Sequence, residues 1–356
     1  MRTTALLIAA IALAGCAGLP ALPRLPDLTP APAVAEAPLP EGAFRFVVVG
    51  DTPYGPEDVT MLRAAVPRIK AMRPPFVIHV GDFKSGGAAC DQAADDAFAA
   101  LIADLAPIPV FYTPGDNDWT DCDRGLDPAT GNPMSELLRL DRLRARFLAG
   151  APAGSAAFGW SRQGTSGDNF TWRTGNIRFA TVHQVGTGNG YEFVTGDLVD
   201  QAGLQARQRA ILAGLWIDQA AEAARTEGSA ALVIALQADP TDGAGAAAGP
   251  CRVASAGRQD CDGHLILRES LRLAAAKFTG PILVVHGDTS PFTLNQDFVD
   301  VAAPNLWRLN AAGDAGTADG GIPYGERDVT VVTVTPGSAT PFAARGLLNG
   351  RLAGAN

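Results

Sequence analysis

Residues 80–86 read Val-Gly-Asp-Phe-Lys-Ser-Gly, and residues 114–122 read Pro-Gly-Asp-Asn-Asp-Trp-Thr-Asp-Cys. In each stretch a Gly-Asp pair ends or closely follows a short apolar run, 76–81 or 110–113, whose composition is typical of a buried strand. Glycine allows the tight turn that ends such a strand and directs the next carboxylate beyond it. Ligands bind at that edge of an open α/β sheet, so these stretches bear on both fold and site.

The same pattern recurs along the chain. Three further expected strands are each followed by an acidic or amide residue: 44–50 by Asp51, 231–236 by Gln237, and 282–286 by Asp288. Apolar residues at helical spacing occupy the segments between strands, at 57–72, 92–105, 135–149, 204–224 and 265–278. This alternation predicts an α/β fold with largely parallel strands. Antiparallel strands are expected at 170–174 and 177–182, and late strands at 306–309 and 329–334.

Because the carboxyl ends of parallel strands meet at one edge, the polar residues after these strands are expected to converge: Asp51, Asp82, Asp116, Gln237 and Asp288. Several carboxylates at one point repel one another unless a cation lies between them. A single Gly-Asp after a strand is also a common turn. Its repetition at successive strand ends is difficult to explain by turns alone, and it favours a cation site.

These motifs resemble those of the calcineurin-like metallophosphoesterases across residues 44–334. That family carries Asp-x-His, Gly-Asp, Gly-Asn-His-Asp/Glu, a solitary His and Gly-His-x-His at five strand ends, and it binds two metals with them. The resemblance implies an α/β sandwich of two mixed β-sheets flanked by helices. It also implies a phosphoesterase-like hydrolase.

Several family ligands are changed here. The corresponding motifs read Asp51-Thr52-Pro53, Gly81-Asp82, Gly115-Asp116-Asn117-Asp118, the single Gln237, and Gly287-Asp288-Thr289-Ser290. By the resemblance, the first metal position would be built from Asp51, Pro53, Asp82 and Ser290, and it is damaged. The second would be built from Asp82, Asp116, Gln237 and Asp288, which offer only oxygen. We therefore expect one hard divalent cation, Mg²⁺, Mn²⁺ or Ca²⁺, with Asp51 nearby.

Four residues are candidates for catalytic roles. In the family, the His of the third motif helps to protonate the leaving oxygen and its acidic neighbour orients it; Asn117 and Asp118 stand there, and an amide is not a general acid near neutral pH. Lys84 could place an ammonium near the vacated metal position, or be a solvated loop lysine. His286 could face the crevice, or be a hydrogen-bonded histidine at a strand end.

The resemblance leaves two functions open. The first is hydrolysis of an exported phosphomonoester or phosphodiester by a metal-dependent enzyme with a small phosphorylated ligand as substrate. The alternative is an envelope lipoprotein that binds a cation or a phosphoryl ligand and has lost catalysis. The formal net charge of −9 excludes nucleic acid as a partner through general electrostatics.

The N-terminus predicts export. Residues 1–15 combine Arg2, an apolar run at 5–13 and small residues, as in a secretory signal peptide, and the run is too short to span a bilayer. The sequence Leu13-Ala14-Gly15-Cys16 resembles the lipobox of bacterial lipoproteins, in which the Cys is acylated. An ordinary signal peptide with an incidental Cys is the alternative. We expect a lipid on Cys16 that anchors the protein to the bacterial cell envelope.

Residues 16–43 are rich in proline and are expected to form a semi-rigid spacer between anchor and domain. The domain is expected at 44–335, followed by a C-terminal tail at 336–356. Four other cysteines remain, and in an oxidising compartment they suggest two disulfides with three possible pairings. We expect Cys90–Cys122 and Cys251–Cys261. A Cys/His zinc site that includes His264 is the alternative, but no CxxC spacing supports it.

Overall fold

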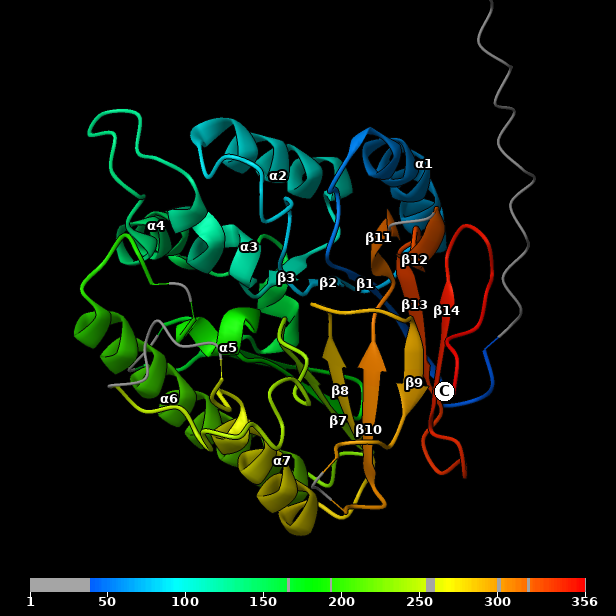
Figure 1. Ribbon diagram of the computed structural model, residues 1–356. Coiled ribbons are helices and arrows are strands. Elements are labelled where there is room, and N and C mark those ends of the chain that lie inside the picture. Colours follow the sequence, from blue (N-terminus) through cyan, green and yellow to red (C-terminus); the bar gives the residue numbers. More distant parts are fainter. Residues whose placement is uncertain are drawn as a thin grey trace, which may run out of the picture. The chain divides into compact units, whose positions relative to one another are not determined.

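The computed structural model describes residues 39–355, except 165–166, 193, 254–259, 300–301 and 319–320. The predicted signal peptide, Cys16 and nearly all of the predicted linker lie outside the described residues. Two β-sheets form the middle of the domain (Figure 1). The first contains, in spatial order, β14 (Phe342–Gly346), β13 (Thr330–Val334), β1 (Phe44–Val49), β2 (Val77–His79) and β3 (Val110–Tyr112).

The second sheet has seven strands and is also mixed. Its spatial order is β4 (Ser161–Arg162), β5 (Phe170–Thr174), β6 (Ile177–Thr181), β7 (Ala231–Ala235), β8 (Ile282–His286), β10 (Leu306–Asn310) and β9 (Thr293–Asn295). In this sheet β6, β7, β8 and β10 run parallel, as β1, β2 and β3 do in the first sheet. The prediction of two mixed sheets in an α/β fold is confirmed.

The two sheets pack face to face through aromatic side chains. Phe76 of the first sheet and Phe179 of the second have ring centroids 4.9 Å apart, and Trp172 stacks on Phe111 at 3.8 Å. These rings belong to one buried apolar cluster that both sheets share. Large aromatic side chains bury much apolar surface, so this layer is the main source of hydrophobic stabilisation.

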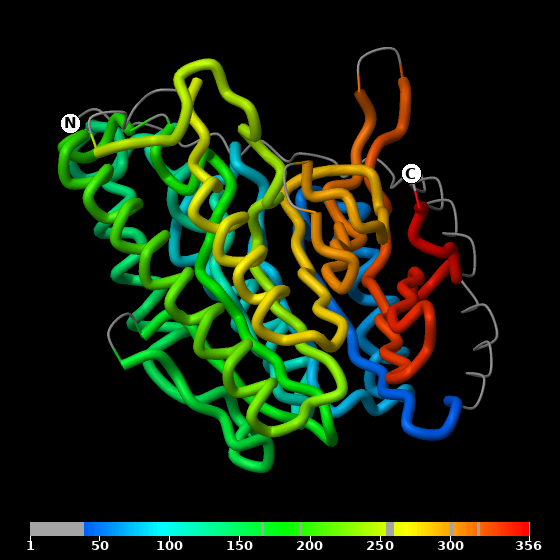
Figure 2. The backbone as a smooth tube through the Cα atoms, turned by 90° about the horizontal axis from the view of Figure 1, so that it is seen from below, coloured from blue at the N-terminus to red at the C-terminus, as the bar shows by residue number. Residues whose placement is uncertain are grey.

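Helices cover the outer faces of both sheets. The first sheet is covered by α1 (Pro56–Met72) and α2 (Gln92–Leu105), and the second by α6 (Val199–Thr226) and α7 (Leu265–Lys277), which lie side by side in Figure 2. The predicted helix at 135–149 divides into α4 (Glu136–Leu143) and a wider turn η2 (Arg144–Leu148). In the described part of the chain, no helix combines the length and apolar character needed to cross a membrane.

The predicted boundary at residue 335 is too early. Strand β14 pairs antiparallel with β13, and its Phe342 and Ala344 belong to the core cluster between the sheets. A hairpin of β11 (Gly313–Ala318) and β12 (Ile322–Glu326) was also not predicted. Both additions are short, and their alternation of small and polar residues gives little strand signal. The segment after residue 335 is therefore partly built into the fold.

Both predicted disulfides are present, Cys90–Cys122 and Cys251–Cys261. The first joins the loop after β2 to the helical turn η1 (Thr120–Arg124), which follows α3 (Asp116–Trp119). All four cysteines are consumed, so the zinc alternative is excluded. His264 is instead buried, with its Nδ1 3.3 Å from Gln184 Nε2.

Candidate functional site

The carboxyl ends of five parallel strands, from both sheets, contribute one polar residue each to a common site. Asp51 follows β1, Asp82 follows β2, Asp116 begins α3 after β3, Gln237 follows β7, and Asp288 follows β8. All five side chains are buried or nearly so. The sequence prediction that they converge is confirmed by the hydrogen bonds that connect them.

Left-handed backbone conformations direct three of these carboxylates. The φ angles of Asp51, Asp82 and Asp288 are 50°, 58° and 71°. A non-glycine residue in this region costs roughly 1 kcal/mol, and such strain is concentrated at functional sites. The glycine before Asp288 is required for a different reason, since a Cβ at Gly287 would lie 1.8 Å from Asp51 Oδ2.

The Gln237 amide lies among three carboxylates. Its Nε2 is 3.3 Å from Asp82 Oδ2, 2.9 Å from Asp116 Oδ1 and 3.1 Å from Asp288 Oδ1. Its Oε1 accepts a hydrogen bond of 2.7 Å from the Gly186 backbone N–H. A backbone N–H can only donate, so it identifies the oxygen and turns the NH₂ group toward the carboxylates. Gln237 is therefore a hydrogen-bond donor here, which corrects the predicted role of metal ligand.

A second neutral donor lies between Asp51 and Asp82. The Tyr54 hydroxyl is 2.9 Å from Asp82 Oδ2 and 3.4 Å from Asp51 Oδ1. Asp51 Oδ1 also accepts from the Asp288 backbone N–H at 2.8 Å. Asp51 Oδ2, in contrast, is buried and has no hydrogen-bond partner among the described residues. A buried oxygen of this kind requires a water, a proton or a cation.

No positive side chain neutralises the site. In the described part of the chain, none of Asp51, Asp82, Asp116 and Asp288 forms an ion pair with Lys, Arg or His. Burial raises the pKa of Asp51, Asp82 and Asp288 well above the usual range, and the neighbouring Asp116 charge raises them further. The four carboxylates therefore form a centre of strong negative potential that attracts cations.

The predicted catalytic pair has a positioning role in this geometry. Asn117 Nδ2 donates to Asp82 Oδ2 at 2.7 Å and to Tyr54 at 2.9 Å, so it fixes the orientation of the Asp82 carboxylate. Asp118 accepts from the backbone N–H groups of Asp82, Phe83 and Gly115. It also accepts from the Tyr112 hydroxyl, so it joins two loops and is not the partner of Asn117.

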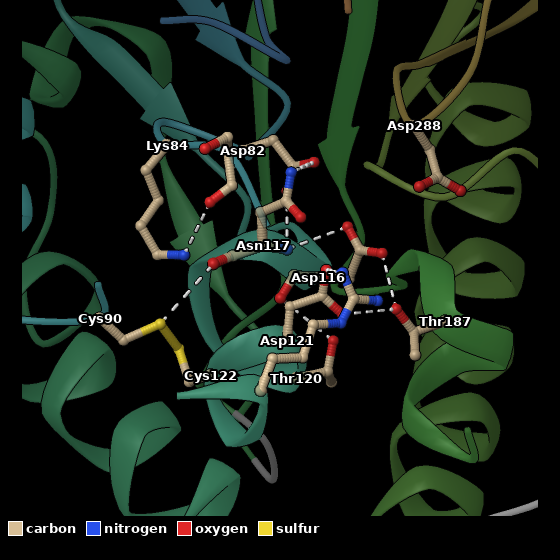
Figure 3. Close-up of polar contacts among 12 residues, drawn as sticks. Asp82, Lys84, Cys90, Asp116, Asn117, Thr120, Asp121, Cys122, Thr187 and Asp288 are labelled. Atoms are coloured by element: carbon tan, nitrogen blue, oxygen red, sulfur yellow. Dashed lines mark hydrogen bonds and ion pairs between the residues drawn. A yellow bond between two sulfur atoms is a disulfide. The ribbon is translucent and has the colours of Figure 1, made fainter. Parts of the chain in front are cut away.

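Lys84 lies beside the site, and His286 faces elsewhere. The Lys84 side chain is only 4% exposed, and its Nζ donates to Ser85 O at 3.1 Å (Figure 3). Burial lowers the pKa of Lys84, while the charges of Asp118 and Asp82 oppose that shift. His286 Nδ1 is 2.8 Å from its neighbouring carbonyl Gly287 O, and the charges nearest its ring belong to Asp239 and Arg308. The structure therefore brings Lys84, and not His286, to the carboxylates.

Further polar residues that the sequence analysis did not select also border the site. Asp314, which begins with Ala315 the turn of β11, has φ 44° and its N–H donates to Asp51 O at 2.9 Å. Burial and the Asp116 charge raise the pKa of Asp314 to about 6. The Thr187 hydroxyl donates to Asp116 Oδ2 at 2.7 Å from the α5 segment (Gly186–Gly190), as Figure 3 shows. Asp314 carried a usable signal, because Gly313-Asp314 follows a predicted strand; Thr187 carried none.

Residues 44–289 match the family model described as calcineurin-like phosphoesterase. The chain belongs to this family. Its members are generally hydrolases and typically use divalent metals. The searched curated proteins contain no match to this sequence.

Three similar solved structures illustrate how far the chain has diverged. A dimetal phosphatase from Danio rerio is 12% identical, with 82% of this chain and 95% of that chain covered and a TM-score of 0.46. GAP50, the anchor in the inner membrane complex of Plasmodium, is 12% identical, with coverage of 87% and 86% and a TM-score of 0.46. The structure of PhoD is 13% identical, with coverage of 91% and 69% and a TM-score of 0.49.

The family's divalent cations can be tested against this site by chemistry. Among the described residues, no three His, Cys, Asp or Glu side chains are arranged as a ready metal site, because amide and phenol donors lie between the carboxylates. The donor set nevertheless fits one hard cation, since it is all oxygen, carries no compensating positive charge and includes the unpartnered Asp51 Oδ2. It fits zinc poorly, because no His or Cys lies among the donors.

Proposed function

We propose that this protein hydrolyses a small exported phosphomonoester or phosphodiester with one hard divalent cation held by Asp51, Asp82, Asp116 and Asp288. The observation that carries the proposal is the convergence of four buried carboxylates without a positive side chain. A cation there would supply charge for a phosphoryl oxygen and lower the pKa of a bound water. Phosphate esters are dianionic or monoanionic, and this uncompensated acidic site would repel them in the absence of a cation.

The residues of the chain itself would orient the components. Asn117 holds the Asp82 carboxylate, and Tyr54 connects it to Asp51. Lys84 adds a positive charge beside Asp82 and would attract an anionic substrate to that side. Its pKa is lowered by burial, which makes it the best-placed group to give a proton to a leaving oxygen.

One observation favours the non-hydrolytic alternative. The position that carries a proton-donating His in the family is Asn117, whose amide is occupied by Asp82 and Tyr54. On that alternative the site binds a cation or a phosphoryl ligand and releases it unchanged. We place either activity outside the cytosol, on a lipid attached to Cys16, because the signal-like segment and lipobox-like sequence precede the domain.

A panel of phosphomonoesters and phosphodiesters tests the proposal, with Mg²⁺, Mn²⁺, Ca²⁺ or a chelator in separate reactions. We expect cation-dependent turnover that Asp82→Asn abolishes and that Asp104→Asn, an exposed substitution on α2, leaves intact. Cation binding without turnover of any substrate would support the alternative function. Absence of both would reject both.

A further inference from the structure

A second polar pocket lies outside the acidic site, between η2, α6 and the ends of the hairpin strands. It has a volume of about 220 Å³. Its polar lining comes from Arg144, Asp168, Asn169, His183, Gln205, Gln208 and Arg209, and Leu212 completes it. Trp119 separates two of these residues from the acidic site, with Arg209 above its ring at 4.7 Å and His183 at 5.7 Å.

The charges that line this pocket are net positive. Arg144 Nε is 3.0 Å from both oxygens of Asp168, and Arg144 Nη2 is 2.6 Å from Oδ2. His183 Nδ1 lies 3.1 Å from the same Oδ2. Burial alone would raise the pKa of Asp168, but the bonds from His183 and Arg144 lower it to about 2, so it is ionised. Two arginines thus face one carboxylate in a chain whose net charge is −9.

Arg209 has an unused donor. Its Nε donates to Asn189 Oδ1 at 3.0 Å and its Nη2 donates to Asn189 O. The remaining Nη1 is buried and has no hydrogen-bond partner among the described residues, although Arg209 is only 7% exposed. The nearby Glu136 leaves this charge unneutralised, because burial raises the pKa of Glu136 to about 10 and keeps it protonated. An unpaired buried guanidinium nitrogen calls for an acceptor.

His183 has an unused acceptor. The ionised Asp168 can only accept, so His183 Nδ1 carries the proton. Burial lowers the pKa of His183 to about 4, so at neutral pH its Nε2 is an unprotonated acceptor. Nε2 is buried and has no partner within the described residues, and the side chain is 1% exposed. The pocket therefore presents donors on two arginines beside one acceptor on a histidine.

We propose that this pocket binds inorganic phosphate in a form that retains a P–OH group. The phosphate oxygens would accept from Arg209 and Arg144, and the P–OH would donate to His183 Nε2. The volume exceeds that of a few waters, each of which occupies about 30 Å³, so phosphate fits with room to spare. Sulfate has the same shape but no O–H near neutral pH, so the histidine would discriminate against it. This inference is independent of the proposed hydrolase function.

Arg209 also connects the pocket to the acidic site. It holds Asn189 of the α5 segment, in which Thr187, Gly188 and Asn189 have left-handed φ angles of 53°, 59° and 60°. The same segment supplies the Gly186 N–H to Gln237 and the Thr187 hydroxyl to Asp116. Substitution of Arg209 would therefore disturb both sites, and it is not a clean test of phosphate binding.

Isothermal titration of the protein with inorganic phosphate in chelator at neutral pH tests the proposal, because without cations the acidic site repels anions. We expect binding, with sulfate at least about tenfold weaker through the loss of one hydrogen bond to a buried group. Arg144→Gln should weaken phosphate binding about tenfold or more. Arg207→Gln, a substitution of an exposed arginine of α6 outside the pocket lining, should change it less than about twofold.

A second pair of variants avoids the buried ion pair. Gln208→Glu places a carboxylate at the exposed rim of the pocket and should also weaken phosphate at least about tenfold, whereas Gln201→Glu on the same helix should not. Equal affinity for phosphate and sulfate, or equal effects of each variant and its control, would overturn the proposal. Loss of phosphate binding in Asp82→Asn would overturn it too, by locating the anion in the acidic site. Unchanged phosphate binding in an Asp82→Asn protein without turnover would support it.

Discussion

The Gln237 side-chain NH₂ group donates to Asp116 Oδ1 over 2.9 Å, while its carbonyl oxygen is held by the Gly186 backbone N–H. A neutral donor thus lies where three carboxylates from different strand ends meet. In the absence of a cation, this amide is the group that reduces their mutual repulsion. It makes the site competent to fold before any cation arrives.

Gln237→Glu tests that role directly. The substitution removes both N–H donors and adds a carboxylate, so we expect the free energy of unfolding in chelator at pH 8 to fall by about 2–3 kcal/mol. Urea unfolding with and without Mn²⁺ provides the measurement, and the variant should gain more stability from the cation than the natural sequence does. Gln92→Glu, at an exposed position of α2, is the control. Equal stability of the two variants would contradict this role of Gln237.

The pH dependence of stability in chelator follows from the raised pKa values. Groups whose pKa is raised in the folded state hold protons that the unfolded chain has lost, so stability falls as pH rises through their folded pKa values. Burial raises the pKa of Asp121 to about 7 and that of Glu136 to about 10. Buried histidines with lowered pKa values, such as His183 at about 4, act in the opposite sense, but only below about pH 6.5.

Between pH 6.5 and 8.5 we therefore expect a monotonic fall in stability. Glu136 alone contributes about 1.4 kcal/mol per pH unit in this window. Glu136→Gln keeps a neutral donor beside Asp123 and removes that titration, so its stability curve should be flatter. Thermal unfolding at a series of pH values provides the test. An identical slope in Glu136→Gln and the natural sequence would show that Glu136 is ionised in the folded protein.

The Cys90–Cys122 disulfide closes a loop with a sequence separation of 32, and Cys251–Cys261 closes one of 10. Loop-closure entropy predicts stabilisation of about 3–4 kcal/mol by the first and about 3 kcal/mol by the second. Replacing Cys90 and Cys122 together by alanine should therefore destabilise the protein slightly more than replacing the other pair. Only the first pair braces the turn that follows Asn117, so only its loss should weaken cation binding. Equal cation affinity in both double variants would refute that bracing role.

The sequence carried most of the fold and the membership of the site. Regular alternation of buried strands and helices predicted both sheets, and a Gly-Asp or amide after each parallel strand identified Asp51, Asp82, Asp116, Gln237 and Asp288. These are local signals, because strand composition and turn chemistry depend on neighbouring residues. The even number of cysteines likewise indicated the two disulfides.

The roles of individual side chains could not be predicted in the same way. The orientation of Gln237 depends on the Gly186 N–H, which lies 51 positions away in sequence. Asp118 is a loop brace because two N–H groups from residues 82 and 83 point at it. His286 faces Asp239 and Arg308 because of the side of β8 on which it lies. Such contacts are set by tertiary packing, to which a residue pattern is blind.

Cys16→Ser tests the predicted anchor. The small residues before Cys16 and the proline-rich segment after it fit a lipoprotein, so the variant should move from the membrane fraction to the soluble fraction. Immunoblotting of fractionated cells measures this, with Cys251→Ser as a control that leaves the lipobox-like sequence intact. Membrane association that persists in Cys16→Ser would place the anchor elsewhere.

Cation binding at the carboxylates is the most direct test of the acidic site. Asp82 lies at its centre, with Oδ2 bonded to Tyr54, Asn117 and Gln237 and Oδ1 accepting from the Asn117 N–H. A cation at this position would relieve repulsion among four carboxylates, so millimolar Mg²⁺, Mn²⁺ or Ca²⁺ should raise the melting temperature by several degrees. Asp82→Asn removes the central charge and should abolish most of that increase. In chelator the same variant should be at least as stable as the natural sequence, because one repelling charge is gone. Asp104→Asn should retain the full response, and zinc should compete weakly, since no His or Cys lies among the donors. No binding of any of the three cations by isothermal titration at millimolar concentration would mean that the carboxylates are held by Gln237 and Tyr54 alone.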